Sequence, residues 1–92
     1  MNKRKRLIQA QQLVDTIKYE YANSNIAKAW EYWKELFELY NTPSAASDEQ
    51  RMADCVELHS FLQQITNEEV YAITDYGNRL FMAKESFIYE RG

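Results

Sequence analysis

Cys55 and His59 are the two side chains whose types and spacing could support chemistry. They stand four residues apart, so a helix would place them on one face, where a thiol and an imidazole can act as nucleophile and base or as two metal ligands. Both positions also share the apolar side of the helix predicted there, beside Met52 and Leu62. We therefore expect a buried cysteine and a hydrogen-bonded core histidine. Two ligands do not complete a zinc site, and Val56 occupies the position where a di-iron bundle needs glutamate.

The remaining candidates for chemistry fit ordinary structural roles. Glu31, Glu35 and Glu38 fall on one side of a predicted helix and could hold a hard cation or imitate the phosphates of a nucleic acid. Lysines alternate with them, which is typical of a solvated polar face. Ser60 adjoins His59, but neighbours in sequence point to different sides of a helix, and the two glycines cannot form a phosphate-binding loop. These patterns predict a protein that is not an enzyme and has no cofactor and no metal site.

The composition indicates one globular helical domain over residues 1–92. Apolar residues make up 46% of the chain and charged residues 27%, a mixture that excludes disordered and collagen-like classes. With two glycines and one proline, the chain also lacks the turn residues that an all-β fold needs. The expected fold class is therefore all-α.

Positive charge gathers at the N-terminal tip, residues 1–6. The tip contains Lys3, Arg4, Lys5 and Arg6, which could contact phosphate groups or an acidic protein surface. The whole chain has a net charge of −3, so it lacks the broad basic field of a nonspecific nucleic-acid binder. We expect a cytoplasmic protein that does not associate with membranes, because a single cysteine cannot form an internal disulfide and no signal peptide or membrane span is recognisable.

Apolar residues recur with helical spacing in four segments, which cover residues 7–22, 25–41, a stretch starting near Asp48, and residues 67–90. Polar turn residues separate the first two segments, and a linker that contains Pro43 separates the second from the third. Two capping boxes, formed by Ser47 with Gln50 and by Thr66 with Glu69, mark the starts of the last two segments. These signals predict a compact bundle or an orthogonal array of about four helices.

The second segment has the widest apolar face. Its apolar residues cover about half of the helical cylinder, more than one neighbouring helix can bury. A chain of this size also buries only about 63% of its unfolded surface by itself. We therefore expect a homodimer and assign Trp30, Trp33, Phe37 and Tyr40 to its interface.

Residues 67–90 allow two interpretations. As one helix, they present a coherent apolar stripe that contains Gly77, where a missing side chain would let another helix approach closely. Alternatively, a short strand precedes a shorter helix, because the run Val70–Leu80, with its YAITDYG pattern, resembles the wing-to-helix segment of bacterial winged-helix regulators. That resemblance implies a small hairpin and a DNA-recognition helix before it. Residues 54–65 would form that helix, and they contain no Lys or Arg for base contacts.

Several large apolar residues fall on the side of their helix opposite the core stripe. Tyr and Met are enriched at protein interfaces, so we assign these positions to a partner-binding surface. They are Ile8, Tyr19, Tyr71, Met82 and Tyr89. We therefore expect a small inhibitor or adaptor that binds a protein partner stoichiometrically, such as a phage or mobile-element regulator. The alternative is a winged-helix DNA-binding transcriptional regulator.

Overall fold

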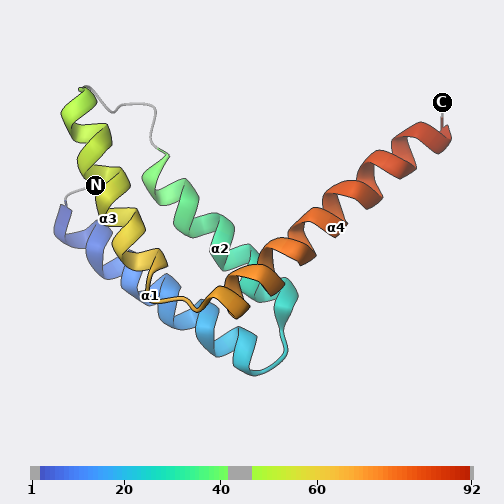
Figure 1. The fold of residues 1–92 in the computed structure, drawn as a ribbon, viewed down its shortest axis with the longest axis horizontal. Coiled ribbons are helices and arrows are strands. Elements are labelled where there is room, and N and C mark those ends of the chain that lie inside the picture. Colours follow the sequence, from blue (N-terminus) through green and yellow to red (C-terminus); the bar gives the residue numbers. More distant parts are fainter. Residues whose placement is uncertain (1–2, 42–46, 92) are drawn as a thin grey trace.

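The chain folds into four helices whose limits agree closely with the predicted segments (Figure 1). The computed structural model describes residues 3–41 and 47–91, with side chains described as far as residue 81. The helices are α1 (Lys3–Ala22), α2 (Ile26–Tyr40), α3 (Asp48–Leu62) and α4 (Asn67–Arg91). The described residues contain no strand, which confirms the all-α bundle of about four helices. Because α4 is continuous through the segment that resembles a wing, the hairpin alternative is wrong.

Side chains cap the last two helices where the sequence predicts. At the start of α3, the Ser47 hydroxyl accepts a 3.1 Å hydrogen bond from the backbone N–H of Gln50. At the start of α4, the Thr66 hydroxyl accepts from the N–H of Glu69 at 3.2 Å, and the Glu69 carboxylate accepts from the N–H of Thr66 at 3.0 Å. In the predicted turn between α1 and α2, Ser24 has a φ of 64°, a left-handed geometry that ends α1.

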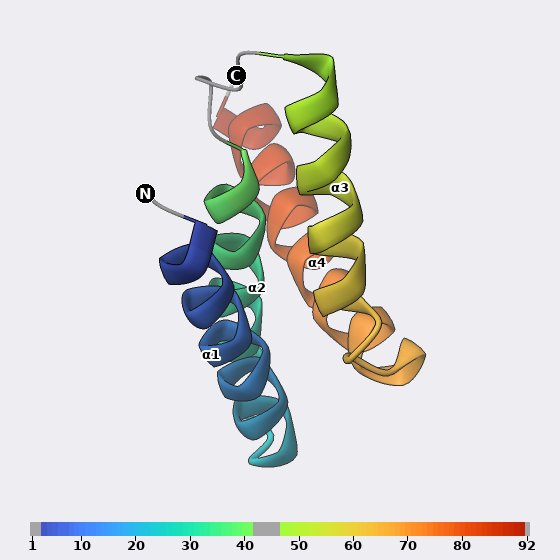
Figure 2. The same ribbon diagram turned by 90° about the vertical axis from the view of Figure 1, so that its left-hand side faces the viewer.

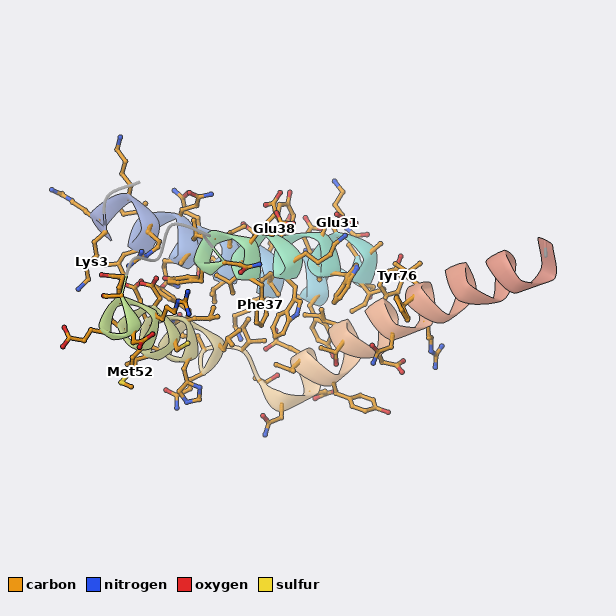
Figure 3. The ribbon with its side chains drawn as sticks, turned by 90° about the horizontal axis from the view of Figure 1, so that it is seen from above. Lys3, Glu31, Phe37, Glu38, Met52 and Tyr76 are labelled. Carbon is orange, nitrogen blue, oxygen red and sulfur yellow. The ribbon has the colours of Figure 1, made fainter. Side chains whose placement is uncertain are left out.

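The helices form two layers. α1 and α2 run antiparallel in one layer, and α3 and α4 both lie on the same side of that pair (Figures 2 and 3). The core fills the space between the layers and is dominated by aliphatic side chains, because α1 and α2 turn their apolar stripes toward each other and toward α3 and α4. The core residues are Ala10, Leu13, Val14, Ile17, Ala29, Trp33, Leu36, Phe61, Ile65 and Ile73.

The crossing of α4 over α2 depends on Gly77. This glycine is buried, and the ring of Trp30 lies directly over it. A Cβ atom at this position would lie 2.6 Å from two ring carbons of Trp30, far closer than carbon atoms can approach. The predicted close approach at Gly77 is therefore confirmed, and Trp30 is the group that makes it.

Polar contacts from α1 fix the corner between α3 and α4. Gln11 and Gln64 exchange side-chain amide hydrogen bonds of 2.9 and 3.2 Å. The ammonium group of Lys18 donates to the backbone carbonyl of Gln64 at 3.0 Å and pairs with the carboxylate of Glu69 at 2.9 Å. Burial alone would raise the pKa of Glu69, but the hydrogen bonds from Lys18 and Thr66 outweigh it and lower the pKa below its ordinary value. The corner is thus held in place by charged and amide groups.

Candidate interaction surface

A buried ion pair decides which side of α3 faces the core. The guanidinium of Arg6, on α1, contacts Asp54 at 3.1 Å and Glu57 at 2.8 Å, both on α3. The same guanidinium lies 5.3 Å from the ring centroid of Tyr40, on α2. Burial, and after it the carboxylate of Glu57, raise the pKa of Tyr40, so this phenol stays neutral at all ordinary pH values. Arg6 therefore joins three helices.

The apolar spacing predicts a core face of α3 made of Met52, Cys55, Val56, Leu58, Phe61, Leu62 and Ile65, and this prediction is wrong for the first three. Since Asp54 and Glu57 face inward, the opposite side of the first part of the helix, with Met52, Cys55 and Val56, faces outward. Met52 is 70% exposed and Val56 is 67% exposed. Cys55 and His59, expected in the core, are exposed as well. Only the later part of the predicted apolar face, from Leu58 onward, packs against the core.

A groove runs between the outward side of α3 and the first turns of α1. It encloses about 770 Å³. Leu7, Met52, Ala53 and Val56 supply its apolar lining, and its polar lining consists of Lys3, Arg6, Glu49, Gln50 and Glu57. Lys3 and Met52 lie at the same end of the molecule in Figure 3. The groove is a concave, mainly apolar surface with both cationic and acidic residues in its lining, and two of its residues, Met52 and Val56, belong to the side of α3 predicted to face the core.

The predicted partner-binding residues lie on two helices. Ile8 and Tyr19 are exposed on α1, and their separation of eleven residues places them on one side of that helix. Tyr71 is exposed in the first half of α4. The side chains of Met82 and Tyr89 lie outside the described residues. The side chains of Ile8, Tyr19 and Tyr71 therefore lie on the surface, as the sequence predicts.

The basic tip is divided between the surface and the fold. Lys3, Arg4 and Lys5 are exposed at the start of α1. Arg6 is half-buried and neutralises Asp54 and Glu57, so its expected contact with phosphate or with an acidic partner would break an internal ion pair. The tip therefore offers an external anion fewer cations than the sequence indicates.

The four aromatic residues assigned to an oligomer interface differ in exposure. Trp33 is buried in the core, 5.2 Å from the ring centroid of Phe37, and Tyr40 is half-buried beneath Arg6. Trp30 covers Gly77, while Phe37 is 39% exposed. A shallow groove of about 340 Å³, lined by Trp30, Trp33, Lys34, Phe37 and Glu38, follows this side of α2. We call it the α2 groove.

The candidate catalytic and metal-ligating residues lie on the surface of the described part of the chain. Cys55 and His59 face outward, and no cluster of three His, Cys, Asp or Glu side chains that could hold a metal occurs among residues 3–41 and 47–81. On α2, Glu31, Glu35 and Glu38 are exposed, and Lys34 pairs with Glu31 at 3.3 Å. This is the solvated face that the sequence predicts. No helix of the described part is both long enough and apolar enough to cross a membrane.

The fold and its surface define a small four-helix protein with apolar grooves and, among its described residues, no cluster that could hold a metal. No protein family, no curated protein and no solved structure matches this chain.

Proposed function

We propose that this protein is a non-enzymatic interaction protein, an inhibitor or adaptor that binds a protein partner stoichiometrically. The observation that supports this proposal most strongly is the exposure of apolar residues on the outward side of α3. Met52 and Val56 expose more than two thirds of their surface beside a groove of about 770 Å³, although inward positions on the same helix are occupied by carboxylates. Contiguous exposed apolar surface with a polar rim is typical of protein interaction sites.

The partner surface that fits this groove is mainly apolar, with charged groups of both signs at its edge. Leu7, Met52 and Val56 offer apolar contact, and Met52 can adapt its shape to a partner. Arg6 and Glu57 pair with each other, so Lys3 and Glu49 offer one charge of each sign to a partner with complementary charges. Ile8, Tyr19 and Tyr71 extend the candidate contact area beyond the groove.

The experiment compares partner capture by the natural chain and by a variant with Met52→Lys and Val56→Lys. Both positions are exposed, so the variant should keep the thermal stability of the natural chain. After the partner is identified and purified, calorimetry should give a fixed stoichiometry, and the variant should bind at least about tenfold more weakly, which is 1.4 kcal/mol. A matched control, Glu35→Lys on the outer face of α2, should bind like the natural chain.

Unchanged affinity in the Met52 and Val56 variant would refute the assignment of the groove. Turnover of a substrate by the purified chain would refute the non-enzymatic proposal as a whole. The winged-helix alternative has no comparable support, because α4 is continuous where that fold requires a hairpin.

We also propose that the protein forms a homodimer. The exposed edge of Phe37 in the α2 groove supports this proposal, since the apolar face of α2 is only partly covered by α1, α3 and α4. Sedimentation velocity across a wide concentration range tests it. A strict monomer at every concentration would refute it.

A further inference from the structure

Helix α4 extends beyond the helix that supports it. At a rise of about 1.5 Å per residue, the 25 residues of α4 span about 37 Å, whereas the 15 residues of α2 span about 22 Å. Figure 1 shows the second half of α4 leaving the other three helices. Leu80 is 41% exposed and Phe81 is 61% exposed, which indicates that the contact with α2 ends soon after Gly77.

The apolar stripe of α4 continues past this point. Glu69, Val70, Ile73 and Gly77 form the side that packs on the bundle. Eighteen residues are five full turns of a helix, so in the sequence Phe87 and Ile88 repeat the angular positions of Glu69 and Val70. Leu80 and Phe81 are therefore exposed at the start of a segment whose sequence continues the apolar pattern. We call residues 80–91 the α4 extension.

The α2 groove is apolar and carries balanced charge, so it could accept the α4 extension. Figure 3 shows Phe37 pointing from α2 into the space between α3 and α4. The groove is apolar along Trp30, Trp33 and Phe37, and it carries one charge of each sign at its edge, Lys34 and Glu38. The α4 extension contains Lys84, Glu85, Glu90 and Arg91 and is therefore neutral overall. No like-charge repulsion opposes contact between the two surfaces.

The exposed area of one chain is large enough for a stable dimer. The chain exposes 7089 Å², whereas a folded monomer of 11.0 kDa is expected to expose about 5,600 Å². The excess is about 1,500 Å² per chain, and a specific interface of standard size buries about 800 Å² on each partner. Two copies could therefore bury a standard interface and still expose the area of ordinary folded domains.

We infer that two copies of this chain associate reciprocally, with the α4 extension of each copy lying in the α2 groove of the other. Both halves of the contact belong to the same chain, and a two-fold axis brings each extension to the opposite groove. The first half of α4 stays on its own α2, where Trp30 covers Gly77. This inference rests on the proposed homodimer and specifies its interface.

Two single substitutions test the contact from its two sides. Phe37→Lys places a cation in the α2 groove, and Phe81→Glu places an anion on the α4 extension. Each should weaken the dimer at least about tenfold in sedimentation velocity, since a buried unpaired charge costs more than the 1.4 kcal/mol that this factor represents. The control is Gln12→Lys, at an exposed position of α1 outside both contact surfaces, which should leave the dimer unchanged.

Mixing the two variants adds a test that misfolding cannot imitate. In a mixed dimer, Lys at position 37 of one copy faces Glu at position 81 of the other, so the mixture should associate more tightly than either variant alone. Far-UV circular dichroism of each variant should match the natural chain. A natural chain that is strictly monomeric would refute both the homodimer and this interface. A dimer that tolerates both substitutions would refute this interface alone. Binding of a different protein in the α2 groove that leaves the dimer intact would refute it as well.

Discussion

Removal of the Arg6 guanidinium should destabilise the fold far more than removal of an exposed cation from the same helix. The side chains of Arg6, Asp54 and Glu57 are 17%, 10% and 12% exposed, so their ion pairs resemble buried pairs more than surface pairs. Breaking a buried pair costs about 3–5 kcal/mol, and breaking an exposed pair costs about 0–1 kcal/mol. Because water still reaches the edge of this cluster, we expect Arg6→Met to cost about 3 kcal/mol.

Urea unfolding followed by tryptophan fluorescence measures this loss, since Trp30 and Trp33 lie within the packed part of α2. A domain of this size is stable by roughly 5–14 kcal/mol, so the expected loss is a substantial fraction of the total. At about 4–8 °C per kcal/mol, the melting temperature should fall by about 12–24 °C. Arg4→Met, at an exposed position of the same turn, is the control and should change stability by less than about 0.5 kcal/mol.

A second variant separates the loss of the ion pair from the loss of packing. Arg6→Met combined with Asp54→Leu and Glu57→Met removes all three charges and leaves side chains of similar volume. Its stability should return to within about 1 kcal/mol of the natural chain or exceed it, because no unpaired carboxylate stays buried. Equal small losses for Arg6→Met and Arg4→Met would refute the role assigned to this ion pair in orienting α3.

Three further substitutions have defined outcomes. Gly77→Ala should lower stability by about 1–2 kcal/mol in thermal melts, since overpacking against Trp30 exceeds the gain in helix propensity of about 1 kcal/mol; a more stable variant would contradict the contact. Thr66→Ala should cost about 1 kcal/mol in urea unfolding by removing the cap of α4, and no loss would contradict it. Glu69→Gln should be less stable than the natural chain at pH 7. The difference in stability between the two chains should narrow as the pH falls below 4.5, the ordinary pKa. The pKa of Glu69 is lowered in the folded chain, so the stabilisation from its carboxylate is complete above pH 4.5 and is lost as the carboxylate becomes protonated. Parallel stability curves would refute the Lys18–Glu69 pair.

The helix limits could be predicted from the sequence because their signals are local. Apolar spacing located the four segments, and the hydroxyl groups of Ser47 and Thr66 marked two helix starts within about one residue. The close approach at Gly77 could also be predicted, since a glycine within an apolar stripe leaves room for a neighbouring group where a larger residue would fill it. The identity of the covering group, Trp30, depends on the crossing of two helices and could not.

The orientation of the first part of α3 could not be predicted from apolar spacing, because that method places every carboxylate outside. Asp54 and Glu57 face inward only because Arg6, about fifty residues earlier in the chain, supplies the opposite charge. One signal was present in the sequence. Arg6 precedes Ala10, Leu13 and Ile17 by four, seven and eleven residues, so this cation falls within the apolar stripe of the first helix. A cation at such a position needs an acidic partner inside the fold.

Polar contacts from α1 support the corner between α3 and α4, beside the apolar packing of Ile65. Gln11 and Lys18 hold the corner by hydrogen bonds to Gln64. These bonds are formed by amide and ammonium groups, for which water and ions can compete. Concentrated salt weakens such contacts and strengthens apolar packing. We therefore expect concentrated salt to loosen the corner at Gln64 before it loosens the apolar core.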